Sequence, residues 1–137
     1  MPDTVRLVEY FYITTSDKPG EGARALNYLR DEGVNLMAFH GFPAARRAQL
    51  DFVPSDSAAF RAAAKKAKWK VTGPKKAFLI EGDDRVGALV DYYTRLAEAK
   101  INVVASNAVV AGLGRFGTIL WVKAGDVKKA AKVLGAG

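Results

Sequence analysis

Along the chain, apolar residues either alternate strictly with polar residues or recur at helical spacing. The alternating pattern predicts strands, and the helical spacing predicts helices. Residues 6–14 are rich in β-branched and aromatic side chains and predict a strand. Residues 21–32 carry apolar side chains at helical spacing, and Gly33 is expected to end this helix. Alternation returns over residues 34–42 and predicts a second strand.

The residues that follow complete the set of strands and helices predicted for the first half of the chain. Residues 43–47 predict a turn and residues 48–53 a short strand. A second helix is expected to open at residues 54–56 and to run to about Lys68, with one stripe of apolar residues. Residues 69–72 predict a fourth short strand, ended by Gly73-Pro74.

The second half repeats this order. The expected elements are a strand at 77–81, a helix at 86–100, strands at 101–110 and 116–122 around a glycine-rich turn, and a helix from Gly125. The sequence reaches Gly137 before any fourth strand, so the second copy is expected to lack its last strand.

The two halves also align residue by residue, without gaps, from 17–38 to 84–105 at an offset of 67. The identical pairs are Asp17 and Asp84, Gly20 and Gly87, Leu29 and Leu96, Asn35 and Asn102, and Ala38 and Ala105. Internal repetition sets the architecture. We therefore expect an α+β protein of two ferredoxin-like βαββαβ modules, 1–74 and 75–137, each with both helices on one face of an antiparallel sheet.

Amino-acid composition and charge bear on the cellular compartment of the protein and on the kinds of site it can contain. The 137 residues include no cysteine, which excludes disulfides and thiolate metal sites and favours the cytoplasm. The N-terminal sequence shows no signal peptide, and the longest nearly apolar run, 101–113, is too short and polar for a membrane span. The net charge of +7 is concentrated in lysine clusters at 65–70, 75–76 and 128–132. We interpret these as solvated helix faces in preference to a polyanion site.

Catalytic chemistry has little support in the sequence. The single histidine, His40, falls among apolar residues of a strand and is expected to be half-buried rather than a general base. One histidine and no cysteine make a metal site improbable. Gly112-Leu113-Gly114 joins two strands, so it predicts a hairpin turn rather than a nucleotide loop. We therefore expect no enzyme, no metal and no cofactor.

The repeated loops that open the first helix of each copy are better candidates for a site. Free backbone N–H groups at a helix start bind carboxylates, and Gly20 and Gly87 let a ligand approach closely. Asn35 and Asn102, at the far end of each helix, could face the loop of a neighbouring module and complete a site for a small zwitterion. The simpler interpretation is structural, with aspartates as caps and glycines in turns, and the residues alone leave both open.

At these positions the sequence resembles the ACT domain family of ligand-sensing modules. The resemblance rests on Asp17-Lys18-Pro19-Gly20, the amphipathic helix and Gly33-Val34-Asn35-Leu36, and it covers both copies as a stand-alone tandem protein. It implies that modules pair, as in a homodimer, and bind an amino acid or similar metabolite at their interface. The implied ligand-binding positions are Asp17, Pro19, Gly20 and Asn35, and Asp84, Val86, Gly87 and Asn102, with Val86 in place of the loop proline. With no catalytic domain attached, a regulated enzyme would be a separate chain. In the family's strand order the missing last strand lies beside the first, so the resemblance also implies an exposed edge at 77–81 unless a symmetry mate or the first copy covers it.

RNA binding is the alternative function, because RNA-recognition modules share the βαββαβ order and the chain is basic. Phe116 lies on the strand that would carry stacking aromatics, but the surrounding motif is incomplete, and Asp51 puts an acid in the middle of the corresponding strand. Nucleic acid is therefore an improbable partner.

Overall fold

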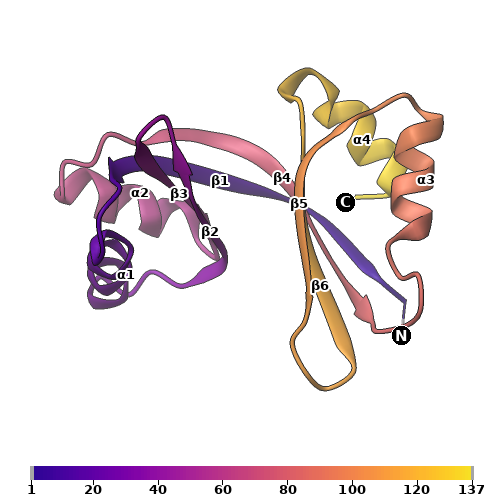
Figure 1. Ribbon diagram of the computed structural model, residues 1–137, viewed down its shortest axis with the longest axis horizontal. Coiled ribbons are helices and arrows are strands. Elements are labelled where there is room, and N and C mark those ends of the chain that lie inside the picture. The colour runs from indigo at the N-terminus through magenta and orange to yellow at the C-terminus, as the bar shows by residue number, and fades with distance from the viewer. Residues whose placement is uncertain (1, 137) are drawn as a thin grey trace. The chain divides into compact units, whose positions relative to one another are not determined.

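The computed structural model describes residues 2–136 as an α+β chain (Figure 1). The strands are β1 (Thr4–Ser16), β2 (Leu36–Ala44), β3 (Arg47–Pro54), β4 (Thr72–Asp83), β5 (Val103–Val110) and β6 (Arg115–Val122). The helices are α1 (Glu21–Asp31), α2 (Ser57–Lys66), α3 (Val90–Glu98) and α4 (Val127–Leu134), the last preceded by the short 3₁₀ helix η1 (Ala124–Asp126). The two-copy α+β fold expected from the sequence is confirmed.

The chain divides into two compact units. One spans Glu9–Lys75 and is called the first module here; the other joins the residues up to Val8 with those from Lys76 onward and is called the second module. The sequence-based division at residue 74 assigned the first eight residues to the first module instead. Because β1 is 13 residues long, its two halves can belong to different modules, which a linear pattern does not reveal.

Each module has the same strand order. It is β2-β3-β1-β4 in the first module and β5-β6-β4-β1 in the second. The hairpins β2–β3 and β5–β6 are antiparallel, and so are the pairs β1–β3 and β4–β6. Phe11 on β1 lies opposite Phe52 on β3, and Phe78 on β4 lies opposite Leu120 on β6. In the second module α3 and α4 lie together on one side of β5 and β6 (Figure 1).

The last strand of the second module comes from the beginning of the chain. Residues 4–8 of β1 lie beside β4, and Val5 and Leu7 pack against the core of the second module. Asp3 lies against Gly82, where an added Cβ would stand 1.9 Å from its Oδ1. The edge at 77–81 is therefore covered by the N-terminal segment of this chain.

The sequence predicted a strand that ends at Gly73-Pro74, and this prediction was wrong. Residues 69–71 are not in a strand, and β4 runs without interruption from Thr72 to Asp83. The structure also corrects one turn, since Ala45 and Arg46 both adopt positive φ and join β2 directly to β3. Neither residue type signals such a two-residue turn, which usually contains Asn or Gly.

The helix starts differ between the copies and from expectation. Asp17 does not cap α1: the N-cap residue is Gly20, in a left-handed conformation with φ 95°, and no side chain caps this helix. Asp84 does not cap α3 either, because its backbone N–H donates to Gly114 O at 2.7 Å and the helix begins only at Val90. Residues 86–89, expected to be helical, form turns. The helix α2 begins where expected, after residues 54–56, and the side chain of Asp56 caps it.

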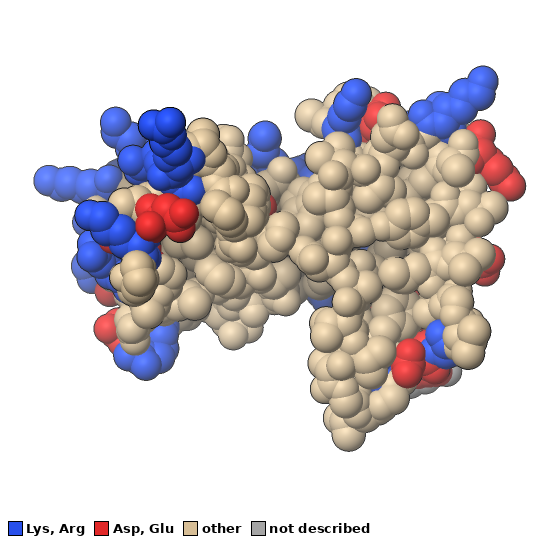
Figure 2. Space-filling model, in the orientation of Figure 1, with Lys and Arg blue, Asp and Glu red and all other residues tan. Residues whose placement is uncertain are grey.

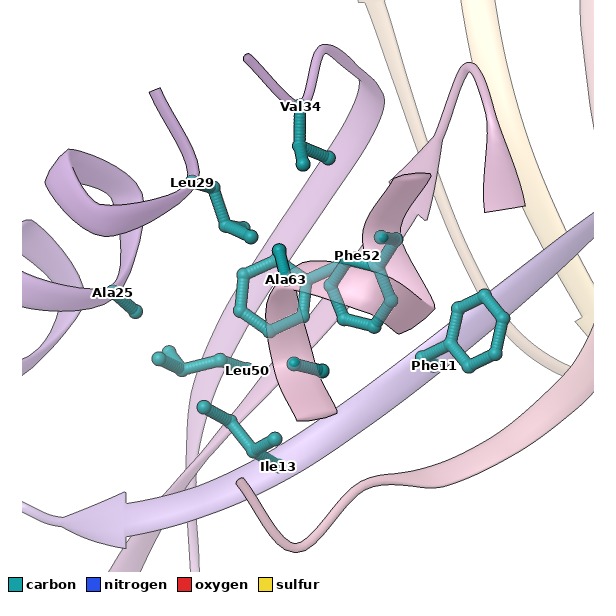
Figure 3. Close-up of a cluster of buried hydrophobic side chains, with 10 residues drawn as sticks. Phe11, Ile13, Ala25, Leu29, Val34, Leu50, Phe52 and Ala63 are labelled. Carbon is teal, nitrogen blue, oxygen red and sulfur yellow. The ribbon is translucent and has the colours of Figure 1, made fainter. Parts of the chain in front are cut away.

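Apolar side chains from both helices and the sheet form a separate core in each module. In the first, β1 contributes Phe11 and Ile13, and β3 contributes Leu50 and Phe52 (Figure 3). Their partners in this core are Ala25, Leu29, Val34, Phe60, Ala63 and Ala64. The second core is built from Phe78, Ile80, Tyr92, Leu96, Ile101, Phe116, Leu120, Val122, Ala130 and Leu134. Among residues 2–136, no helix has the length and apolar character needed to cross a membrane.

Candidate functional site

The loop between β1 and α1 is open and exposed, as a ligand-binding loop requires. Asp17, Pro19 and Gly20 are all exposed, and a Cβ on Gly20 would meet no atom within 4 Å. The helix start that follows has no side-chain cap. The Glu21 N–H donates to Lys18 O at 3.4 Å, and the backbone N–H groups that come next can meet a bound anion. Glu21, the first helical residue, is turned back toward the strand and accepts a hydrogen bond from Ser16 Oγ at 3.1 Å.

Asn35 lies at the other end of α1. Its side-chain Nδ2 donates to Ser55 Oγ at 2.9 Å, and its carbonyl accepts from the Ser55 backbone N–H at 2.9 Å. The side chain therefore ties the start of β2 to the start of α2. Within one module it does not meet Asp17, Pro19 or Gly20, so these residues could share a ligand only across two modules.

The corresponding loop of the second module is longer and more apolar. Val86 is fully exposed, and Gly87 adopts a left-handed φ of 71°. A Cβ on Gly87 would lie 3.3 Å from a methyl group of Val90, so the approach to the backbone is narrower than at Gly20. Asn102 is exposed just before β5, again away from the loop. This copy offers the weaker anion site.

A pocket of about 650 Å³ in the first module was not foreseen from the sequence. It lies at the end of β1, beside α1 and the end of α2, and next to the loop that holds Asp17 and Gly20. Its lining consists of Ile13, Thr14, Thr15, Ser16, Glu21, Arg24, Ala25, Tyr28, Arg47, Ala67, Lys68, Trp69 and Lys70. These residues come from distant segments. The one available signal was the repeat itself, which sets Ala25 opposite the much larger Tyr92.

Aromatic and apolar side chains form one wall of this pocket. Tyr28 and Trp69 lie with ring centroids 5.3 Å apart, and the Tyr28 hydroxyl donates to Ala63 O at 2.6 Å. This hydrogen bond gives the Tyr28 hydroxyl an acceptor on α2 and so holds the ring in place. Ile13 and Ala25 belong both to the lining and to the buried core.

The polar part of the pocket is predominantly basic. Its lining contains four basic residues and a single acid, Glu21. Glu21 Oε1 lies 3.4 Å from the Arg24 guanidinium, so its charge is compensated. The Arg47 guanidinium donates to a backbone carbonyl, Thr14 O, at 3.3 Å. Lysine and arginine gather over the part of the molecule that contains α1 and α2 (Figure 2). The local potential therefore favours an anion.

His40 is half-buried, as expected, and stands opposite Asp51 in the β2–β3 register. Asp51 is 5% exposed and accepts a hydrogen bond from Gln49 Nε2 at 2.9 Å. Burial raises the pKa of Asp51, while Gln49, His40 and Lys75 oppose the shift. Within residues 2–136, no three or more His, Cys, Asp or Glu side chains are grouped to hold a metal ion.

The aromatic residue that RNA binding would use is not on an open sheet face. Phe116 is 5% exposed and belongs to the core of the second module. A base cannot stack on a ring that packs under the helices, so this placement speaks against the RNA-binding alternative.

Solved structures share this fold at low sequence identity. The protein BT0572 of Bacteroides thetaiotaomicron is 18% identical with a TM-score of 0.81, over 96% of this chain and 88% of that one. The regulatory subunit of aspartate kinase from Thermus thermophilus is 15% identical with a TM-score of 0.63, over 98% of this chain and 96% of that one. The corresponding subunit from Thermus flavus gives 14% and 0.60, over 98% and 95%.

At these identities the likeness concerns the fold, which is the tandem ACT fold that the sequence resembles. No protein-family model matches the sequence, and no curated protein is similar enough to count as a relative.

Proposed function

We propose that this chain is a small-molecule-sensing regulatory protein without catalytic activity, which binds an amino acid or a similar metabolite. The observation that carries the proposal is the start of α1, where an exposed glycine in a left-handed conformation precedes backbone N–H groups that no side chain caps. Such a start binds a carboxylate well. Support comes from the fold, which is shared with regulatory subunits of aspartate kinase.

The proposed ligand contacts are the loop residues Asp17, Pro19 and Gly20, with Asn35 supplied by a neighbouring module. A homodimer would bring a second copy of Asn35 to the loop, since the two sites lie at opposite ends of α1 in one module. Asp84, Val86, Gly87 and Asn102 would form the weaker counterpart. The regulated enzyme would be a separate chain, and the absence of cysteine suits a reducing, cytoplasmic setting.

A thermal-shift screen with the free amino acids tests the proposal, because a ligand that binds only the folded state raises Tm. A ligand that raises Tm in the wild-type protein should fail to do so in Ala23→Glu. The new carboxylate, in the first turn of α1, repels a ligand carboxylate but interacts favourably with the helix start, so stability should be kept.

Ala62→Glu, on the exposed side of α2, is the matched control, because it adds the same charge away from the loop. It should retain the ligand response. If no amino acid stabilises the wild-type protein, or if Ala23→Glu responds like Ala62→Glu, the proposed site is wrong.

A further inference from the structure

The two modules correspond residue by residue beyond the stretch that is visibly repeated in the sequence. The helices α1 and α3 bury the equivalent pairs Ala25 and Leu29, and Tyr92 and Leu96. The second helices end alike, with Trp69 N donating to Ala64 O and Ala136 N to Ala131 O. All these pairs keep the 67-residue offset, so the pocket residues on α1 and at the end of α2 can be compared with their counterparts in the second module. Arg47 is matched to Arg115 by the strand register instead.

This comparison shows why the first module is hollow. Tyr92, 5% exposed in the second core, has Ala25 as its counterpart. Leu134, 2% exposed, has the half-buried Ala67. Both alanines line the pocket. The second module therefore fills with its own side chains part of the space that the first module leaves open.

The charged residues at this place also differ between the two modules. In the second module Asp83 is opposite Arg115 in the β4–β6 register, and Arg115 Nη1 lies 2.8 Å from Asp83 Oδ1. In the first module the register sets Ser16 opposite Arg47, so the carboxylate is replaced by a hydroxyl. Arg47 keeps its position at the pocket but has no acidic side chain facing it across the strands.

Other substitutions around the pocket add positive charge. Arg24 stands where the second module has Asp91, and Lys68 where it has Gly135. Lys68 and Gly135 share a left-handed backbone, with φ 58° and 73°, so the helix ends are equivalent and only the side chain differs. At these positions the first module lacks the Tyr92 ring and the Asp83 carboxylate of its sister module, whereas Tyr28 and Trp69 of the pocket wall stand where the sister module has Arg95 and Ala136.

We propose that this pocket binds a small anionic aromatic molecule, a flat apolar ring carrying one carboxylate or phosphate group. The ring would lie beside Ala25, Tyr28 and Trp69, and the anionic group would meet Arg47, as the Asp83 carboxylate meets Arg115. The volume of about 650 Å³ is suited to such a ligand. The pocket adjoins the uncapped start of α1, since Glu21 lines it, but the proposed contacts are different residues and the inference does not depend on the proposed amino-acid function.

Fluorescence of Trp69 tests the inference directly. The chain has two tryptophans, so Trp121→Phe leaves Trp69 in the pocket wall as the single reporter. The probes are 3-phenylpropionate and phenyl phosphate, compared with the uncharged 3-phenylpropanol and the cationic 3-phenylpropylamine. We expect a saturable change of emission with at least one anion, and binding about tenfold or more weaker for the alcohol and the amine. Comparing the affinities of 3-phenylpropionate and phenyl phosphate shows whether the pocket prefers a carboxylate or a phosphate.

Two variants in the same background locate the bound probe. Arg47→Gln should weaken anion binding about tenfold, whereas Lys65→Gln, which removes an equal charge from the exposed side of α2, should not. Ala25→Phe should abolish the response by filling the ring space, with Ala62→Phe as the control for added bulk. If Ala25→Phe does not fold, Arg47→Gln decides.

The inference is overturned if none of the four compounds changes the emission, or if the alcohol and the amine bind as well as the anions. Equal affinities in Arg47→Gln and Lys65→Gln would also overturn it. Because the amino-acid screen depends on Ala23 and this one on Ala25 and Arg47, either proposal can fail while the other stands.

Discussion

The Asp3 carboxylate accepts a hydrogen bond from the Arg85 guanidinium, with Oδ2 and Nη2 3.0 Å apart, although the two residues are 82 positions apart in sequence. Asp3 also accepts a hydrogen bond from the Tyr92 hydroxyl. Both partners belong to the second module, so these contacts attach the N-terminal segment to it. The last strand of a module built mainly from the end of the chain is thereby anchored at the chain's beginning.

The first prediction concerns this anchor. The hydrogen bond from Arg85 lowers the pKa of Asp3, so the carboxylate stabilises the fold above its unfolded-state pKa and loses this effect as the pH falls through the lowered folded-state value. Asp3→Asn should therefore lower the urea midpoint at neutral pH, and the difference from wild type should shrink below about pH 4. Urea unfolding at both pH values measures this.

Asp31→Asn is the control for Asp3→Asn, because Asp31 is exposed and forms an ion pair with its exposed neighbour Arg30. It should change the urea midpoint little at either pH. A loss in Asp3→Asn that is equally large in acid would show that the carboxylate charge is not what stabilises the segment.

The second prediction uses the internal repeat. Leu29 and Leu96 are equivalent residues in the two cores, and each is 1% exposed. Leu29→Ala and Leu96→Ala should each reduce the free energy of unfolding by about 3 kcal/mol, because each leaves a cavity in a packed core. Leu26→Ala, at a position 37% exposed, should cost less than about 1 kcal/mol. A small loss in only one of the buried variants would mean that the two cores are not equivalent.

The third prediction separates a true helix cap from an expected one. Asp56 accepts hydrogen bonds from the backbone N–H groups of Ala58 and Ala59, at 3.0 and 3.2 Å. Asp56→Ala should cost about 1 kcal/mol in the free energy of unfolding. Asp17→Ala should change it by no more than about 0.5 kcal/mol, since Asp17 caps no helix. Chemical denaturation of both variants would contradict this assignment if the losses were equal.

The fourth prediction concerns the buried acid of β3. Burial raises the pKa of Asp51, so the unfolded chain releases this proton at lower pH than the folded protein. The carboxyl therefore costs no stability below its unfolded-state pKa. The cost grows as the pH rises from the unfolded-state pKa to the raised folded-state pKa, and it is constant above that. Asp51→Asn, which can still accept the Gln49 hydrogen bond, should raise Tm at neutral pH.

The gain in Asp51→Asn should disappear in acid, where the wild-type carboxyl is protonated in both states. Melting curves across this pH range, with the exposed Glu98→Gln as the control, measure the difference. A lower Tm at neutral pH would indicate that His40 and Lys75 stabilise the carboxylate more than burial destabilises it.

Local patterns were sufficient for most elements. Periodicity identified both helices of each module, Gly33 marked the end of α1, and Asp56 marked the start of α2, because these features depend on neighbours a few residues away. The offset between Asp17 and Asp84 revealed the duplication and hence the fold. The same information failed at Gly73-Pro74, where pairing with β1 keeps the chain extended through residues that usually end a strand.

The candidate sites likewise divide into features that the sequence predicted and features that only the structure showed. By itself, the sequence determined that the chain has two related modules and that a loop with Pro19 and Gly20 opens α1; these loop residues remain predicted contacts. Only the tertiary structure decided that residues 4–8 complete the second module, and that Ala25 and Arg47 border a pocket where the sister module has a ring and a carboxylate. The reason is physical: periodicity records which residues turn inward, whereas an unfilled volume depends on side chains from distant segments packing together.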